Sequence, residues 1–331
     1  MLQDIDQNLD GKSILVTGST GFVGRNLISF LKKTESFKQR NLRIICSGRN
    51  RESLALIHSS RQGFEHFVWD IRTEAQNVPE QIDYVIHLAG EDRFWDSELE
   101  RNQIITTSIV GTTNVLNLVD RVCAKRMLLA SSGAVYPPHE QLNNPRLEDE
   151  YSPLTDIKSL DPYTVGKRKS EQLCFEFSHT HGMKISIARL FTLIGPHFPI
   201  TRPFAIGEFI RMCLRNEPIL VRSSSSVVRS YQNVQDTSRW LISILLSDNP
   251  ENVFNVGDDS PINLPDLARM VAAVCGNQHP IQFALDDNPR NNRNYYIPDI
   301  SKAEKYLGLK NLVPLEASII ETYRAFEKST P

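Results

Sequence analysis

Short apolar runs alternate with helical patterns through the first half of this 331-residue chain. The runs with the length of buried strands are residues 13–17, 42–46, 67–69, 84–88, 127–130 and 184–190. The helical patterns include residues 22–32, 104–122 and 161–181. This alternation is typical of βαβ units, in which helices cover the faces of a parallel sheet. We therefore predict an α/β fold with a Rossmann-type doubly wound parallel sheet.

A glycine-rich turn, residues 18–24, follows the first predicted strand and opens the first helix. Its glycines permit a tight turn and let backbone N–H groups approach a pyrophosphate at the helix N-terminus. The spacing is GxxGxxG, and a strand–helix junction of this kind can also be purely structural. Its position at the first βα turn favours a dinucleotide site. The residues expected to bind the cofactor there are Gly18, Thr20, Gly21, Phe22, Val23 and Gly24.

The end of the second strand bears on the choice between NAD and NADP. An acidic residue here holds the ribose 2′-hydroxyl of NAD, whereas a basic residue accommodates the 2′-phosphate of NADP. Arg49 and Arg51 are available and no acid precedes Glu52, so NADP is favoured, with NAD as the alternative. Asp70 and Ile71 end the third strand, where the carboxylate can accept a hydrogen bond from the adenine amino group. A solvated loop and an ordinary turn would explain the same residues.

Tyr163 and Lys167 are four residues apart in a helical pattern, so their side chains share one face of the helix. Tyrosine has a reference pKa of about 10, and a nearby ammonium stabilises its phenolate. The pair can therefore exchange a proton with a carbinol. Ser131 and Ser132, just past a predicted strand, are both placed to hold the substrate oxygen.

A second Tyr-x-x-x-Lys, Tyr306 to Lys310, demonstrates that this spacing also arises by chance. It contains Gly308, follows no strand-end serine and lies outside the βα region. We therefore assign the chemistry to Tyr163 and Lys167.

The composition argues against several classes of partner. A net charge of -2 gives no reason to expect nucleic acid or a membrane surface. Residues 1–10 lack the basic start and apolar core of a signal peptide, and no apolar stretch approaches the roughly 20 residues of a membrane span. Five scattered cysteines and eight histidines without ligand spacing predict neither a disulfide framework nor a metal site. We expect a cytoplasmic protein.

Several motifs occur in an order that resembles extended short-chain dehydrogenases/reductases, the nucleotide-sugar epimerase/dehydratase family. They are residues 17–24, 86–89, 131–136, 162–167, 229–236, 255–257 and 299–302, so the resemblance covers nearly the whole chain. It implies a Rossmann domain over residues 11–194 that binds NAD(P). A smaller substrate-binding domain over residues 195–331 would follow, with elements able to cross over between the two. The expected partner is a nucleotide-diphosphate sugar, and the expected assembly is a homodimer.

The resemblance also implies roles for individual residues. Ser132 would be the catalytic hydroxyl and Tyr163 the acid/base, while Lys167 would bind the nicotinamide ribose. His87, Leu88 and Ala89 would line the cofactor. The residues expected to contact substrate are Ser132, Thr192, Arg229 and Arg290, of which the two arginines would meet the diphosphate.

Departures from the family pattern narrow the reaction. Dehydratases of the family carry acidic residues after the catalytic hydroxyl, where this chain has Gly133 and Ala134, so 4,6-dehydration is disfavoured. Thr192 and Ser108 each stand where the family usually has asparagine. We expect hydride transfer at a sugar carbon, by a 4-keto sugar reductase or alternatively a C4 epimerase. A non-catalytic cofactor-binding sensor is the alternative from another class, and the intact Ser132, Tyr163 and Lys167 argue against it.

Overall fold

A computed structural model describes residues 2–58, 63–90, 97–137, 144–150, 161–222, 227–249, 252–284 and 295–327. The described helices are α1 (Leu2–Leu9), α2 (Phe22–Leu31), α3 (Glu35–Lys38), α4 (Arg51–Ile57), α5 (Glu98–Arg121), α6 (Pro162–His181), α7 (Ala205–Leu214), α8 (Val234–Leu246), α9 (Leu264–Cys275), α10 (Ser301–Leu307) and α11 (Leu315–Glu327). The strands of the main sheet are β1 (Ser13–Thr17), β2 (Arg43–Gly48), β3 (Phe64–Val68), β4 (Tyr84–His87), β5 (Arg126–Ser132), β6 (Lys184–Leu190) and β11 (Val253–Val256). The shorter strands are β7 (Leu193–Ile194), β8 (Leu220–Val221), β9 (Val228–Arg229), β10 (Gln232–Asn233), β12 (Ile262–Asn263), β13 (Gln282–Phe283) and β14 (Tyr295–Tyr296). A 3-10 helix, η2 (Gly133–Val135), follows β5.

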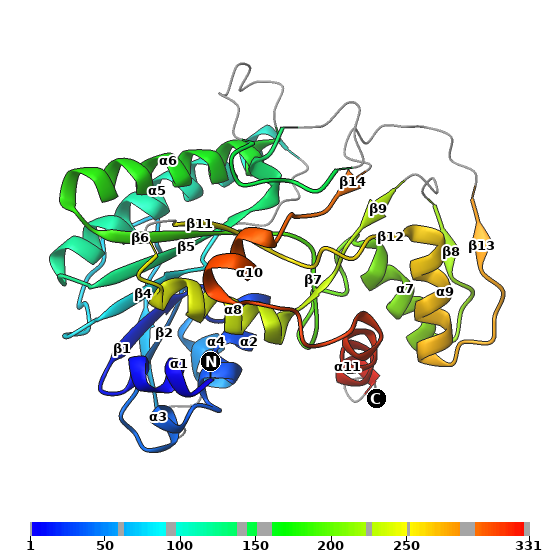
Figure 1. Ribbon diagram of the computed structural model, residues 1–331, viewed down its shortest axis with the longest axis horizontal. Helices are drawn as coiled ribbons and strands as arrows, with labels where there is room; N and C mark the ends of the chain where they lie inside the picture. Colours follow the sequence, from blue (N-terminus) through cyan, green and yellow to red (C-terminus); the bar gives the residue numbers. More distant parts are fainter. Residues whose placement is uncertain are drawn as a thin grey trace. The chain divides into compact units, whose positions relative to one another are not determined.

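The main sheet has seven strands in the order β11-β6-β5-β4-β1-β2-β3. The pairs from β3 to β5 are parallel, and Leu15 of β1 lies in register with Ile45 of β2 and Val85 of β4. Helices α5 and α6 cover one face of the sheet and α2 lies on the other (Figure 1). The predicted Rossmann-type fold is confirmed.

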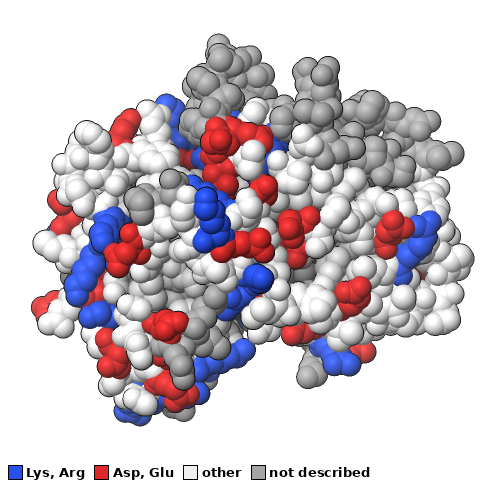
Figure 2. All heavy atoms as spheres, in the orientation of Figure 1, with Lys and Arg blue, Asp and Glu red and all other residues white. Residues whose placement is uncertain are grey.

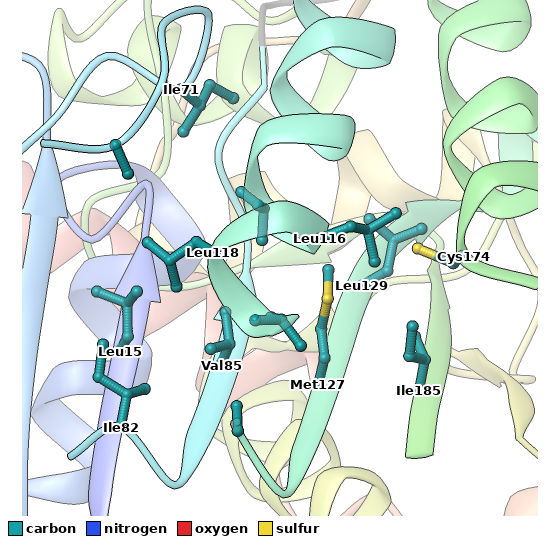
Figure 3. Close-up of a cluster of buried hydrophobic side chains, with 14 of the residues drawn as sticks. Leu15, Ile71, Ile82, Val85, Leu116, Leu118, Met127, Leu129, Cys174 and Ile185 are labelled. Carbon is teal, nitrogen blue, oxygen red and sulfur yellow. The ribbon is translucent and has the colours of Figure 1, made fainter. Parts of the chain in front are cut away.

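Apolar side chains of the strands pack against α5 and α6 on the face that these helices cover (Figure 3). Leu15, Val85 and Met127 come from three neighbouring strands and are 0 % exposed. Leu116 of α5 and Cys174 of α6 cover them. Burying one such leucine contributes about 1.5–3 kcal/mol relative to leaving it in water. This packing holds the carboxyl ends of β1, β4 and β5 side by side, where the predicted site residues lie.

The chain forms two compact units, each of which is built from separate segments. The first unit comprises Met1–Val135, Tyr151–Arg189 and Ser238–Phe254. The second comprises Tyr136–Glu150, Leu190–Thr237 and Asn255–Pro331. The second unit holds the small sheets β10-β7, β12-β9-β14 and β13-β8, and in it α7 packs against α9 and α11. The assignment of the cofactor to residues 11–194 and the substrate to residues 195–331 stays a prediction.

One face of the molecule matches the small net charge of the chain. On the face seen in Figure 2, acidic and basic side chains of the described residues are interspersed. Among the helices described, none combines the length and apolar character that crossing a membrane requires. Within the same residues, His, Cys, Asp and Glu side chains form no group of three that could hold a metal ion.

Candidate active site

The glycine-rich turn is built from close backbone approaches that exclude side chains. Gly18 has a φ of +67°, and a Cβ placed on it would lie 2.7 Å from the backbone nitrogen of Ala89. A Cβ on Gly24 would lie 2.3 Å from the Gly18 oxygen and 2.7 Å from the Ser19 Cα. Ser19 ties the turn to β2, because its backbone N–H and its hydroxyl both donate to the Ser47 carbonyl at 3.1 and 3.0 Å. Packing alone therefore requires glycine at positions 18 and 24, two of the three glycines in the turn.

Helix α2 begins directly after this turn, with Gly21 as its exposed N-cap. Gly21 provides no side-chain cap for the first N–H groups of the helix. Such a helix N-terminus favours an anionic group through its N–H groups and its dipole. Thr20 beside it is half-buried, with a methyl group 3.6 Å from the Cβ position of Gly48. The cradle left by the missing glycine side chains fits the pyrophosphate of a dinucleotide.

The end of β4 lies against the same turn. His87 is buried, and its Nδ1 lies 2.8 Å from the Thr17 hydroxyl oxygen, which also accepts a hydrogen bond from the Ala89 N–H at 3.3 Å. Burial, with the nearby Lys167 charge, lowers the pKa of His87 to about 3, so its imidazole is neutral. Leu88 and Ala89 are half-buried beside Gly18. The three residues predicted to line the cofactor thus adjoin the turn predicted to bind it.

The ends of β2 and β3 carry the groups predicted to choose between NAD and NADP. Arg49 and Arg51 are exposed, and between them Asn50 caps α4 by accepting from the Ser53 N–H at 2.8 Å. Asp70 forms a two-pronged ion pair with Arg72, whose Nε and terminal nitrogen lie 3.0 and 2.6 Å from the carboxylate oxygens. The hydrogen bonds from Arg72, helped by the charge of Arg49, lower the pKa of Asp70. The Asp70 carboxylate is therefore ionised amid a cluster of guanidinium groups.

Ile71 follows Asp70 but faces the protein interior. A Cβ on Gly111 of α5 would lie 2.5 Å from the Ile71 Cδ1, and the Ile71 carbonyl accepts from the Asn114 side chain at 2.8 Å. The side chain is 6 % exposed. The structure therefore gives Ile71 a packing role, and its predicted contact with cofactor stays a prediction.

Tyr163 and Lys167 lie in the first two turns of α6. Asp161 caps this helix by accepting from the Tyr163 N–H at 2.8 Å, and Pro162 opens it, which is a favoured start for a helix. The Lys167 Nζ lies 5.6 Å from the Tyr163 ring centroid and donates to the Ala130 carbonyl of β5 at 2.7 Å. Lys167 is thus anchored to the strand that leads into Ser131 and Ser132.

The charge on Lys167 is governed by burial and by one carboxylate. Burial lowers the pKa of Lys167 to about 8, and the carboxylate of Glu171, one turn further along α6, acts in the opposite direction. The ammonium next to Tyr163 is therefore present at neutral pH and is lost as the pH rises through about 8. His87 adds no competing positive charge, because it is neutral.

The two candidate serines on β5 have different partners. The Ser131 hydroxyl donates to Glu171 Oε1 in the interior. The Ser132 hydroxyl instead accepts from the Ala134 N–H at 3.1 Å and is 7 % exposed. Ser131 is therefore bonded to helix α6. Because adjacent residues of a strand point to opposite faces, the Ser132 side chain points away from that bond. Ser132 is therefore the better candidate for the substrate oxygen.

A buried ion pair supports this arrangement. Arg189 of β6 donates to both oxygens of Glu171, at 3.0 and 2.8 Å, and the two side chains are 2 % and 0 % exposed. Together with Ser131, the pair joins β5, α6 and β6. Sequence reasoning missed Glu171 and Arg189, although the i+4 spacing of Glu171 from Lys167 places both on one helix face.

Small side chains bring α5 and α6 together behind the pair of Tyr163 and Lys167. A Cβ on Gly166 would lie 2.5 Å from the Ser108 hydroxyl oxygen, so only glycine fits there without movement. The Ser108 hydroxyl donates to the Ile104 carbonyl in its own helix at 2.9 Å. Ser170 donates to the Ser108 carbonyl at 3.1 Å and accepts from Thr112 at 2.9 Å. Ser108, which replaces the family's asparagine, thus forms part of this close helix contact.

The predicted substrate residues of the second unit are described separately. Arg229 of β9 is half-buried, donates to the Val228 carbonyl at 2.8 Å and lies 5.9 Å from the Tyr296 ring centroid. Next to it, the buried Ser230 hydroxyl has no hydrogen-bond partner among the described residues. Thr192 is half-buried, and its carbonyl accepts from the Gln232 N–H at 3.0 Å. Arg290 lies outside the described residues.

The motif at residues 255–257 is explained by packing within the second unit. The Asn255 side chain accepts from the Tyr136 hydroxyl at 2.6 Å and donates to the carbonyls of Arg146 and Asp299 at 2.7 and 3.1 Å. A Cβ on Gly257 would lie 2.7 Å from the Pro298 Cγ. Asn255 therefore holds three separate segments together.

Comparison with known proteins gives one family. Residues 14–257 match the model described as the NAD dependent epimerase/dehydratase family. UDP-glucuronic acid decarboxylase 6 of Arabidopsis thaliana is 30% identical over 308 residues, covering 92% of this chain and 86% of the relative. UDP-glucuronic acid decarboxylase 1 of Danio rerio is 29% identical over 321 residues, covering 96% of this chain and 73% of the relative.

Solved structures support the same fold. UDP-glucose 4-epimerase of Thermotoga maritima, solved with UDP-glucose, superposes with a TM-score of 0.81 and 21% identity, covering 96% of this chain and 100% of that chain. UDP-glucuronic acid 4-epimerase of Bacillus cereus, solved as a mutant with UDP-4-deoxy-4-fluoro-glucuronic acid and NAD, has a TM-score of 0.78 and 22% identity. It covers 96% of this chain and 99% of that chain.

Gly18 and Gly11 offer a matched test of the glycine-rich turn. Both are left-handed, with φ of +67° and +66°, but only the Gly18 Cβ position has backbone atoms within 4 Å. Gly11→Ala should cost about 1–2 kcal/mol of unfolding free energy from the left-handed conformation alone. Gly18→Ala should cost more and should also weaken cofactor binding, as measured by denaturant unfolding and titration calorimetry. Equal effects of the two substitutions would contradict the packing role of Gly18.

Proposed function

Because the chain belongs to the NAD dependent epimerase/dehydratase family, we propose that it reduces a nucleotide-diphosphate 4-keto sugar with NADPH. The observation that carries the proposal is the set of groups at the end of β5 and the start of α6. Tyr163 supplies the proton-transfer group and Lys167 the ammonium beside it. Ser132 supplies a hydroxyl. No acid follows Ser132, because Gly133 and Ala134 occupy those positions. Such a site suits oxidation or reduction of a carbinol better than loss of water.

In this mechanism the bound cofactor supplies the hydride that reaches the sugar carbon. The Ser132 hydroxyl donates a hydrogen bond to the sugar oxygen, and the Tyr163 hydroxyl transfers its proton to that oxygen. The Lys167 ammonium stabilises the resulting phenolate and is itself anchored by the Ala130 carbonyl. The neutral His87 keeps the nearby backbone in place through Thr17. A sensor without catalysis would have no need of this complete set.

The named relatives support two other reactions on the same substrate class. Structural neighbours are named as 4-epimerases, and sequence relatives are named as UDP-glucuronic acid decarboxylases. A C4 epimerase would oxidise the sugar carbon and then reduce it again with retained cofactor. We favour reduction because Arg49 and Arg51, both exposed just after β2, suit the 2′-phosphate of NADPH. NAD, which is bound in the Bacillus cereus structure, remains the alternative cofactor. The homodimer and the cytoplasmic location remain predictions.

One assay separates these reactions. Purified protein is incubated with NADPH and a panel of nucleotide 4-keto sugars, and in parallel with UDP-glucose, UDP-galactose and UDP-glucuronic acid. A reductase consumes NADPH only with a keto sugar. An epimerase interconverts UDP-glucose and UDP-galactose with no net change in cofactor, and a decarboxylase releases carbon dioxide from UDP-glucuronic acid. Epimerisation of UDP-glucose and UDP-galactose, or decarboxylation of UDP-glucuronic acid, would reject the reductase proposal.

Tyr163→Phe should lower turnover by roughly 100-fold or more and leave cofactor affinity nearly unchanged, because only the proton-transfer group is lost. Tyr306→Phe is the control, since Tyr306 has the same spacing to a lysine but lies exposed on α10. Turnover by the Tyr163 variant close to that of the wild type would reject the catalytic role.

The rate should depend on pH through Lys167. Its pKa of about 8 means that the ammonium is present below this pH, so kcat for reduction should fall as the pH rises through about 8. Glu171→Gln removes the carboxylate that favours the charged form, so this fall should move to lower pH. Glu176→Gln, an exposed substitution on the same helix, should leave the profile unchanged. An unshifted profile in a folded Glu171 variant would show that Glu171 only supports the fold.

Replacing Arg49 and Arg51 together with alanine should reduce the preference for NADPH over NADH by roughly 1–3 kcal/mol, the range for charge-assisted hydrogen bonds. Titration of the wild type and the double variant with both cofactors measures the difference. Tighter binding of NADH than NADPH by the wild type would reject the NADP assignment.

Arg229→Ala should weaken binding of a nucleotide-diphosphate sugar by about 1.5–3 kcal/mol, because a cation that meets the diphosphate is lost. NADP(H) affinity should not change, since the glycine-rich turn belongs to the first unit. Titration calorimetry with both ligands tests this expectation. Equal weakening of the two ligands would indicate a structural role for Arg229.

A further inference from the structure

The five cysteines occupy three kinds of environment. Cys46 of β2 and Cys174 of α6 are buried, and burial raises the pKa of each thiol to about 12. Such thiols stay protonated and are poor nucleophiles. Cys123 is exposed after the end of α5. Cys213 and Cys275 differ from these three, because they lie close to each other in the second unit.

Two neighbouring helices bring Cys213 and Cys275 together. Cys213 lies in the last turn of α7 and Cys275 ends α9, and these helices pack side by side (Figure 1). The chain turns back at the left-handed Gly276, and the Asn277 side chain then donates to the Cys213 sulfur at 3.4 Å. The same amide nitrogen donates to the Glu217 carbonyl at 2.9 Å, which orients it. Cys275 precedes Asn277 by only two residues, so the contact of the Asn277 amide with the Cys213 sulfur brings the end of α9, where Cys275 lies, beside Cys213.

Their surroundings make the two thiols unequal. Hydrogen bonds from Cys275 and from Asn277 lower the pKa of Cys213 to about 7, despite its burial. The pKa of Cys275 is raised by donation to Cys213, by burial and by the nearby Glu327 of α11. Among the described residues, Tyr323 of α11 also interacts electrostatically with the pair. The Asn277 amide, which donates to the Cys213 sulfur, therefore favours the thiolate form of Cys213 over that of Cys275.

We propose that Cys213 and Cys275 form a modification site, at which a hydroperoxide oxidises the two thiols to an intrachain disulfide between α7 and α9. The Cys213 thiolate attacks the peroxide oxygen, the O–O bond breaks, and an alcohol or water leaves after taking up a proton. The Cys275 sulfur then attacks the Cys213 sulfenic acid, the S–O bond breaks, and water leaves with the Cys275 proton. The two thiols lose two electrons, which the hydroperoxide gains. A small oxidant is required, because Cys213 is 7 % exposed.

The test uses the full chain with Cys123→Ser, which removes the exposed thiol. This protein is treated with hydrogen peroxide at neutral pH, and its intact mass and its unreduced peptides are measured. We expect a loss of two hydrogens, a peptide that joins Cys213 to Cys275, and recovery of both thiols with dithiothreitol. Either Cys213→Ser or Cys275→Ser should abolish the cross-link, while circular dichroism reports that each variant is folded.

A second variant tests the role of the amide. Asn277→Leu removes the hydrogen bond to the Cys213 sulfur, so it should slow disulfide formation several-fold near neutral pH without changing the product. An unchanged rate would reject that role of Asn277. Peroxide treatment that yields no disulfide, one between other cysteines, or only sulfinic acid at Cys213 would overturn the proposal. None of these outcomes depends on the sugar chemistry, so the two proposals stand or fall separately.

Discussion

The attachment of helix α6 to the end of strand β5 is the constraint on which the candidate site depends. Lys167 donates to the Ala130 carbonyl, and Glu171, one turn later, accepts from the Ser131 hydroxyl. Nearer the start of the helix, Thr164 donates to the Ala134 carbonyl at 3.2 Å. These bonds set the depth and rotation of the helix relative to the strand. The positions of Tyr163 and Ser132 relative to each other follow from them.

The same contacts give the site its electrostatic character. A lysine anchored in the interior loses solvation, which favours its neutral form, and a nearby carboxylate opposes that loss. Arg189 in turn pairs with the buried carboxylate of Glu171. Without this partner, the carboxylate would be an unpaired buried charge, which is costly. The charge next to Tyr163 thus depends on a strand, β6, that contributes no group to the chemistry itself.

Local patterns predicted the elements that carry the site. Strand β6 matches the predicted residues 184–190, and α6 differs from the prediction by one residue at its start. These elements are long and strongly patterned, so their own sequence determines them. Strand β3 was placed three residues too late at its start, since a run at residues 67–69 omits the alternating Phe64. Helix α1 was missed because its buried Ile5 and Leu9 are isolated among polar residues.

The roles of Glu171 and Arg189 could not be predicted locally, because they arise only when β6 returns beside β5. The two-residue strands of the second unit likewise form through partners that are distant in sequence.

Residues 238–254 belong to the first unit although they follow most of the second in the chain. They bring Trp240 and Phe254 into the interior, and Asn252 accepts a hydrogen bond from the Ile187 N–H at 2.7 Å along the edge of the main sheet. A chain ended at residue 194 would leave that edge of β6 unpaired, which is a hazard for aggregation. In evolutionary terms, the first unit is not a contiguous module of the sequence. Any recombination of the gene must carry the late segment along with the first half.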